Sequence, residues 1–158
     1  MEWFVVYTKP RSELKVAEGL KKAGIENFCP TITEVRQWSD RKKKITSPLF
    51  KSYVFVYLPD SKREQVFEVP GVVRFLNWLG KPARVMNQEI ETIKTWLADE
   101  NIEEVATEHL QPGDQITIAN GDFKGKDAII QNVGKKRLRL VLKTMGWVVN
   151  VKVRDAVS

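Results

Sequence analysis

The stretch from Pro48 to Leu58 reads PLFKSYVFVYL, and it decides the fold of the first part of the chain. Aromatic residues at positions 53, 55 and 57 alternate with aliphatic residues at 54, 56 and 58. Side chains along a strand point alternately to its two faces, so the pattern predicts a strand over Ser52–Leu58 with one aromatic and one aliphatic face. Trp3–Thr8 alternates in the same way and predicts a second strand. If the two aromatic rows share a sheet face, that face is an apolar surface suited to a partner's helix. The alternative is that both faces are buried core.

The rest of the first hundred residues mixes helical and strand patterns. Helices are expected over Ser12–Ala23, after Asp60, and over Gln88–Glu100, where apolar residues recur at helical spacing. Further strands are expected over Ile25–Ile32 and Val72–Asn77, and a hairpin on both sides of Ser39–Lys43. The order of these elements predicts an α+β fold in which the helices cover mainly one face of the sheet.

The pattern changes near residue 100. Residues 102–111 are polar and acidic and end at Pro112-Gly113, so we expect a linker there. Strands are predicted near 115–119, 127–132, 137–143 and 146–153, with glycines between them. Short strands in about fifty residues must protect their edges, which favours a small curled barrel. The sequence therefore divides into a domain over 1–101, a linker over 102–111 and a second domain over 112–158.

Composition excludes several classes of protein. The 158 residues contain one histidine, His109, and one cysteine, Cys29, too few for a zinc cluster or an intrachain disulfide. No catalytic sequence motif is present, so we expect neither an enzyme nor a bound cofactor or metal. No apolar run approaches the length of a membrane span, and Met1 leads directly into a predicted strand without a signal peptide. These features predict a cytoplasmic protein that does not contact membranes, with Cys29 buried as a small apolar residue.

The basic charge is concentrated in one segment. The whole chain carries a net charge of +6, and Arg36–Lys51 alone contains six basic residues and one acidic residue. Cations at the end of a hairpin are suited to phosphates of nucleic acid. The alternative is an ordinary solvated loop.

Taken in order, several segments resemble the NusG family of transcription elongation factors. The resemblance rests on WFVVYTKPRSELKVAEGL, PLFKSYVFVYL, VPGVVRFL with the later GKPARV, and PGDQITIANGDFKGKDAII followed by KKRLRLVL. It implies an NGN-type α/β sandwich followed by a small SH3-like KOW β-barrel. PLFKSYVFV is more similar to the specialised RfaH-like paralogues than to housekeeping members. Asp122 and Ala128 also depart from the housekeeping pattern.

The resemblance implies a monomeric, non-enzymatic factor whose first domain binds the clamp helices of RNA polymerase, holds the clamp closed and suppresses pausing or termination. Phe50 follows Pro48 and precedes Lys51, a context that predicts an exposed ring. We therefore expect Phe50→Ala or Tyr53→Ala to abolish polymerase binding without disturbing the fold. The positions that match the family's polymerase-binding patch are Tyr7, Phe50, Tyr53 and Phe55.

Nucleic-acid contacts are expected in two places, with non-template DNA or nascent RNA as the ligand. The basic hairpin could neutralise phosphates, and Trp38 could stack on a base. Lys9 matches a position that RfaH uses on non-template DNA, and Arg11 lies beside it. The predicted nucleic-acid residues are Lys9, Arg11, Trp38, Arg41, Lys42, Lys43 and Lys44.

The KOW segment implies an adaptor role for the second domain. Gly121 and Phe123 match its tip, where the ring could meet ribosomal protein S10 or the termination factor Rho. Phe123 could equally cap the barrel core. A different interpretation of the whole chain is an RNA-binding or ribosome-associated KOW protein that does not bind polymerase.

Overall fold

The computed structural model describes residues 1–109, 128–132, 136–142 and 144–153. The chain folds as two compact units, one over Trp3–Leu76 and the other over Asn77–Ser158. Each unit combines helix with antiparallel strands, which confirms the predicted α+β class. No helix among the described residues is long and apolar enough to cross a membrane.

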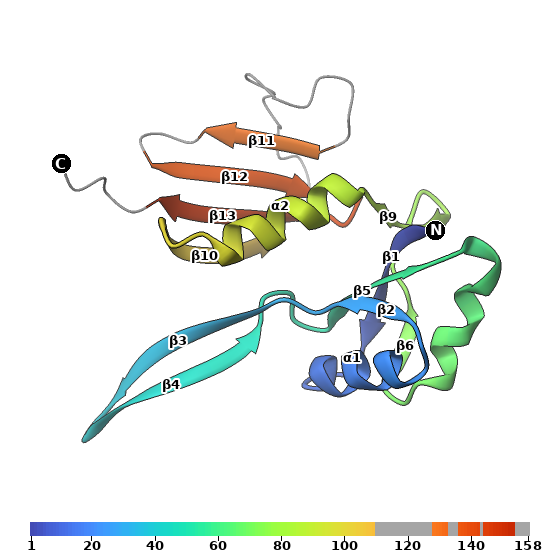
Figure 1. Ribbon diagram of the computed structural model, residues 1–158, viewed down its shortest axis with the longest axis horizontal. Coiled ribbons are helices and arrows are strands. Elements are labelled where there is room, and N and C mark those ends of the chain that lie inside the picture. The colour runs from blue at the N-terminus through green and yellow to red at the C-terminus, as the bar shows by residue number, and fades with distance from the viewer. Residues whose placement is uncertain (110–127, 133–135, 143, 154–158) are drawn as a thin grey trace. The chain divides into compact units, whose positions relative to one another are not determined.

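Strands dominate the first unit, as Figure 1 shows. Its elements are β1 (Glu2–Thr8), α1 (Glu13–Lys22), β2 (Glu26–Phe28), β3 (Thr31–Trp38), β4 (Arg41–Pro48), β5 (Tyr53–Leu58), the 3₁₀ helix η1 (Asp60–Glu68) and β6 (Val72–Phe75). The predicted strand over Ile25–Ile32 is two strands in the structure, β2 and the start of β3. The break falls at Cys29-Pro30, since proline has no backbone N–H for a strand ladder.

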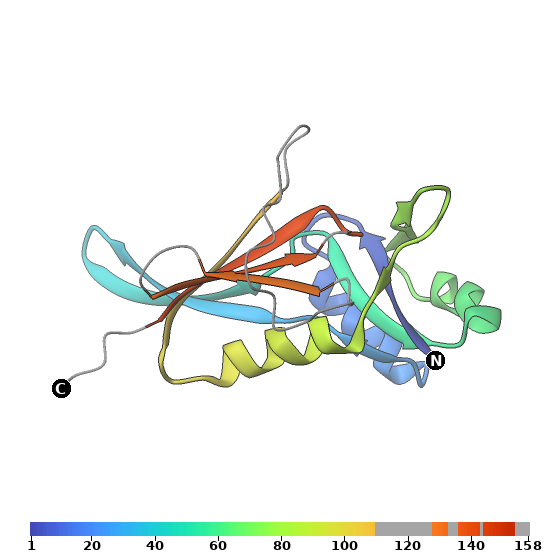
Figure 2. The same ribbon diagram turned by 90° about the horizontal axis from the view of Figure 1, so that it is seen from above.

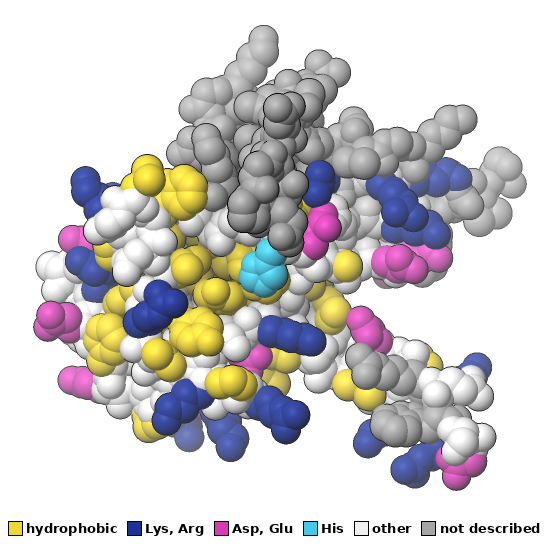
Figure 3. All heavy atoms as spheres, turned by 180° about the vertical axis from the view of Figure 1, so that it is seen from behind, with side chains coloured by type: hydrophobic (Ala, Val, Ile, Leu, Met, Phe, Trp, Pro, Cys, Tyr) yellow, Lys and Arg dark blue, Asp and Glu magenta, His cyan; other side chains and the backbone are white. Residues whose placement is uncertain are grey.

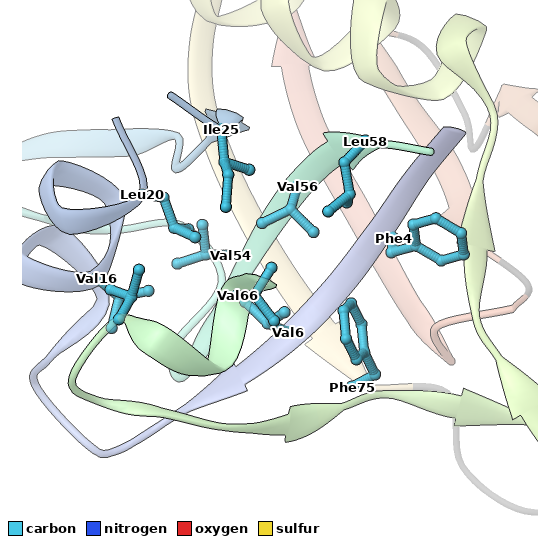
Figure 4. Packing of buried hydrophobic residues seen from close by; sticks show 11 residues of the cluster. Phe4, Val6, Val16, Leu20, Ile25, Val54, Val56, Leu58, Val66 and Phe75 are labelled. Carbon is cyan, nitrogen blue, oxygen red and sulfur yellow. The ribbon is translucent and has the colours of Figure 1, made fainter. Parts of the chain in front are cut away.

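The main sheet of this unit has the strand order β2-β5-β1-β6. Its aliphatic face packs against α1 and η1. Figure 4 shows this core, in which Val16 and Leu20 of α1 lie over Val54 and Val56 of β5. Burial of each such side chain stabilises the fold by roughly 1.5–3 kcal/mol. Two of the three predicted helices, α1 and η1, thus cover one face of this sheet, whereas the third, over Gln88–Glu100, belongs to the second unit.

The helix α1 (Glu13–Lys22) begins and ends within one residue of the predicted bounds, Ser12 and Ala23. Ser12 stands at the N-cap, but its side chain makes no capping hydrogen bond. Gly24 follows the helix with φ of +78°, a left-handed conformation that glycine adopts without strain. The helix therefore depends on tertiary packing of Val16 and Leu20 more than on its cap.

The predicted basic hairpin is the ribbon β3–β4. Its two strands pair antiparallel over eight consecutive residue pairs, from Thr31 opposite Pro48 to Trp38 opposite Arg41. It forms a separate two-stranded sheet beyond the main sheet of its unit, and Figure 2 shows its twist from above. The Thr33 and Thr46 hydroxyl oxygens lie 2.9 Å apart across the strands, near the base of the ribbon.

The second unit contains one long helix and a sheet. Its elements are β7 (Asn77–Trp78), β8 (Lys81–Pro82), β9 (Arg84–Val85), α2 (Asn87–Ala98), β10 (Ile102–His109), β11 (Ala128–Asn132), β12 (Arg137–Leu142) and β13 (Trp147–Val153). The strand order β10-β13-β12-β11 is antiparallel throughout. Leu140 of β12 pairs with Val149 of β13, so the alternating apolar residues share a face as predicted.

Residues 102–109 differ from the expected linker, because they form β10 and pair along β13. Val105 and Thr107 alternate with exposed neighbours, a strand pattern that the acidic composition concealed. The predicted strand over 115–119 lies outside the described residues. Closure of this sheet into a barrel, and a functional boundary at 101, stay predictions.

Candidate functional site

The two aromatic rows of β1 and β5 lie on one face of the main sheet. The rings of Trp3 and Tyr57 are 4.9 Å apart, and those of Tyr7 and Tyr53 are 5.6 Å apart. These pairs run in opposite directions along the two strands, so β1 and β5 are antiparallel neighbours. We call Trp3, Tyr7, Tyr53, Phe55 and Tyr57 the aromatic face.

Burial varies along the aromatic face. Phe55 at its centre is fully buried and Trp3 is 5% exposed, whereas the three tyrosines are half-buried. A half-buried tyrosine offers an apolar ring with a polar hydroxyl at its rim, which is a combination enriched in protein interfaces. The accessible part of this face therefore belongs to Tyr7, Tyr53 and Tyr57.

Phe50 is only 1% exposed, so the expectation that it presents an exposed ring is wrong. Its ring meets Phe55 edge-on, with centroids 5.2 Å apart. The turn after it, with Ser52 at φ of +68° and the Tyr53 N–H donating to the Phe50 carbonyl oxygen (3.3 Å), directs the ring inward. Sequence context missed this because a proline and a lysine nearby do not reveal how a turn orients the residue between them.

A buried carboxylate holds this turn in place. Glu13, in the first turn of α1, is 5% exposed, and its Oε2 accepts a hydrogen bond from the Ser52 N–H (3.1 Å). The Ser52 carbonyl oxygen accepts from the Thr8 N–H at 2.7 Å. Both backbone groups of Ser52 are thus fixed, which supports its left-handed conformation. No feature of the sequence indicates this role, since a glutamate is ordinary at the start of a helix.

Cys29 lies beside this carboxylate. Burial, assisted by the negative charge of Glu13, raises the pKa of the Cys29 thiol to about 11. Cys29 also packs against the hydrophobic core. The thiol is therefore protonated at neutral pH, and Cys29 packs as a small apolar residue, although it is half-buried and not buried as predicted.

Arg74 extends the aromatic face at the β6 side. It pairs with Tyr7 across the strands, and its guanidinium carbon lies 5.4 Å from the centre of the Tyr7 ring. A cation over a tyrosine ring is attracted to the negative face of the ring. Sequence reasoning did not identify Arg74, because the pairing of β1 with β6 is needed to bring it there.

Lys9 and Arg11 lie in the exposed connection between β1 and α1. The Lys9 N–H donates to the Gly71 carbonyl oxygen (2.9 Å), and Arg11 has φ of +62°. A pocket of about 370 Å³ adjoins this connection and is lined partly by Lys9 and Lys15. The structure thus places a second lysine, Lys15, at the same pocket as Lys9, which the sequence predicts to contact nucleic acid.

Arg41, Lys42, Lys43 and Lys44 follow one another along β4 and are all exposed (Figure 3, lower right). Within the part of the chain that the structure describes, none of the four has an ion-pair partner. Trp38 is paired with Arg41 through its backbone at the end of β3. The ribbon is therefore a cluster of accessible cations.

The predicted adaptor residues Gly121 and Phe123 lie outside the described residues. On β12, Arg139 is paired with the Glu108 carboxylate at 2.7 Å, and Asn150 donates to the same carboxylate at 3.0 Å. These two hydrogen bonds, from Asn150 and then Arg139, lower the pKa of Glu108. Arg139 is therefore engaged within its own sheet.

Comparison with known proteins identifies a family. The NusG family model, described as transcription termination factor nusG, matches residues 1–94. The transcription termination/antitermination protein NusG of Streptococcus pyogenes serotype M1 is 26% identical to this chain over 158 residues, as is that of serotype M3 strain SSI-1. Each match covers 91% of this chain and 87% of the relative.

A solved structure described as showing domain interaction in Thermotoga maritima NusG is 22% identical, with a TM-score of 0.44. It covers 97% of this chain and 93% of the Thermotoga chain. The family model covers more than half of the sequence and includes both strands of the aromatic face. The chain therefore belongs to the NusG family of transcription termination/antitermination factors.

Proposed function

We propose that this protein binds the clamp helices of RNA polymerase through its aromatic face and thereby suppresses pausing or termination. The observation that carries the proposal is the pair Tyr7 and Tyr53, whose rings meet edge-on at 5.6 Å and stay partly accessible on neighbouring strands. Family membership supports a role in transcription. Tyrosine and arginine are the residues that most often dominate binding energy at protein interfaces, and Arg74 adjoins Tyr7.

In this proposal the four predicted residues act in two ways. Tyr7 and Tyr53 contact the polymerase directly, since their side chains are accessible. Phe55 belongs to the face and Phe50 packs edge-on against it, and in this proposal both support the accessible tyrosines, because both are buried. The factor would act by binding the closed clamp more tightly than the open one, which shifts the population away from paused states.

The exposed cations of the same unit supply the second part of the proposal. Lys9, Arg11 and the β3–β4 ribbon contact nucleic acid phosphates near the polymerase. Their exposure and the absence of ion-pair partners for the β4 cations, among the residues described, support this role. The second domain, with Gly121 and Phe123 at its tip, acts as a tethered adaptor for S10 or Rho. A specialised, RfaH-like assignment also belongs to the proposal.

Tyr53→Ala tests the polymerase contact. We expect at least a tenfold loss of affinity for RNA polymerase, measured in a pull-down titration or by biolayer interferometry. The ring is a central accessible group of the proposed interface, and truncation of such a group typically costs about 2 kcal/mol of binding free energy. Leu14→Ala is the matched control, since Leu14 is 50% exposed on α1 and lies outside the aromatic face.

The melting temperature of each variant is measured alongside. Unchanged polymerase affinity in a normally folded Tyr53→Ala protein would refute the contact. If the same protein bound RNA tightly without polymerase, the RNA-binding alternative would replace this proposal.

A further inference from the structure

The run of four cations on β4 is divided between two faces of the ribbon. Neighbouring residues of a strand point to opposite sides. Arg41 and Lys43 therefore share one face, and Lys42 and Lys44 share the other. All four side chains are exposed. The run of basic residues that is continuous in sequence thus places two cations of β4 on each side of the thin ribbon.

The ribbon is regular enough to keep this division fixed. Its strands pair without interruption over eight residue pairs. At roughly 3.3 Å per residue, each strand is about 26 Å long. It forms its own sheet, so both faces near the tip are open among the described residues, as the exposure of Val35 (61%) opposite Lys44 illustrates.

We propose that the β3–β4 ribbon enters the major groove of a DNA duplex tip first, so that each face directs its pair of cations toward one phosphate wall. This inference rests on the proposed nucleic-acid contact of the hairpin and names its ligand. The major groove of B-DNA is about 12 Å wide and admits a two-stranded β-ribbon. In such a groove the ribbon lies between two phosphate walls, so all four cations can contact phosphates at once.

Other nucleic acids fit this arrangement less well. A single strand that lies along one face reaches either Arg41 and Lys43 or Lys42 and Lys44, and leaves the other pair unused. Duplex RNA has a major groove that is deep and too narrow for such an element. The placement of cations on both faces therefore favours duplex DNA over single strands and over duplex RNA.

Two double variants of the full chain test the proposal: Arg41→Gln with Lys43→Gln, and Lys42→Gln with Lys44→Gln. Each removes the cations of one face. The control is Lys21→Gln with Lys22→Gln, which makes the same charge change at exposed positions of α1. Fluorescence anisotropy measures affinity for a short DNA duplex at several salt concentrations.

Each phosphate contact contributes about 0.9 to the slope of log affinity against log salt concentration for duplex DNA. Both ribbon variants should lower the slope by about 1.8, since each loses two phosphate contacts, and the α1 control should leave it unchanged. Wild-type protein should bind duplex DNA more tightly than single-stranded DNA or duplex RNA of equal length. Methyl green, a major-groove ligand, should displace it, and the minor-groove ligand netropsin should not.

The contrary outcomes are distinct. Three results would overturn the two-faced duplex contact and still leave a nucleic-acid role for the hairpin. They are a salt slope that changes in only one ribbon variant, tighter binding to a single strand or to duplex RNA, and displacement by netropsin alone. Slopes unchanged in both ribbon variants would overturn that role as well. The titration contains no polymerase, so none of these results depends on the aromatic face.

Discussion

At the scale of single residues, the aromatic face depends on side chains that do not belong to it. Glu13 reaches from α1 to the backbone of Ser52, and Ser52 ends the turn that carries Phe50. Phe50 in turn packs edge-on against Phe55. The exposed Tyr53 immediately follows this turn, so its position is set by a buried carboxylate and a buried ring.

Phe50→Ala should therefore act on stability. Phe50 is fully buried, and truncation of a buried phenylalanine to alanine typically costs about 3–5 kcal/mol. Chemical denaturation should show a loss of this order, and Phe50→Leu should lose much less, because it fills most of the cavity. A Phe50→Ala protein as stable as wild type, with polymerase binding abolished, would restore the role of Phe50 as a direct contact.

Glu13→Ala should destabilise the turn after Phe50. It leaves the part-buried Ser52 N–H without its acceptor, which costs about 1 kcal/mol of unfolding free energy, the lower end of the range for a fully buried group. Glu13→Gln keeps a side-chain oxygen that can accept the same bond, so it should lose less. Hydrogen exchange at the Ser52 amide reports the bond directly. Equal exchange in wild type and Glu13→Ala would show that the carboxylate does not hold this turn.

At the scale of elements, alternation and turn residues predicted most of the strands and both long helices. The strand Ser52–Leu58 was recovered because it has an aromatic row and an aliphatic row, and Trp3–Thr8 because Trp3, Val5 and Tyr7 alternate with Phe4 and Val6. β10 was missed because its three acidic residues mask the alternation of Val105 and Thr107. Contacts between elements, such as Arg74 over Tyr7 or Glu13 at Ser52, have no local signal, since they arise only when distant segments pair.

Glu108→Gln tests the pairing of β10 with its sheet. The hydrogen bonds from Asn150 and Arg139 lower the pKa of Glu108 in the folded protein. The ionised carboxylate thus stabilises the fold above the usual glutamate pKa of 4.5, and this contribution is lost as the pH falls below that value. The side chain is half-exposed, so the loss at pH 7 should be only about 0.2–1 kcal/mol.

Urea unfolding of wild type and of Glu108→Gln is compared across pH. The unfolding free energies of the two proteins should converge as the pH is lowered. Glu103→Gln serves as the control, because its ion pair with Lys152 is longer, at 3.9 Å. If the difference in unfolding free energy between Glu108→Gln and wild type grew toward acidic pH, the stabilising role of the ionised Glu108 carboxylate would be contradicted.

At the scale of the whole molecule, the NusG family model covers residues 1–94, which include both strands of the aromatic face, and the strands β10 to β13 follow this segment. Composition correctly indicated a basic hairpin, and the structure shows that its cations are exposed. The sequence could not show which members of the aromatic set are accessible, since burial depends on the turn geometry at Ser52. The partial burial of the tyrosines and the full burial of the phenylalanines therefore follow from the fold.

The most direct test of the aromatic face is a site-specific cross-link from position 53. Tyr53 is replaced by the photoreactive amino acid p-benzoylphenylalanine, which keeps an aromatic ring at this half-buried site. The full chain is irradiated with RNA polymerase, and the cross-linked peptides are identified by mass spectrometry. The same replacement at Leu14, which is exposed on α1, is the control. We predict that position 53 cross-links to the clamp helices and that position 14 does not. Cross-links from position 53 to another part of polymerase, or none at all from a folded variant, would contradict the account.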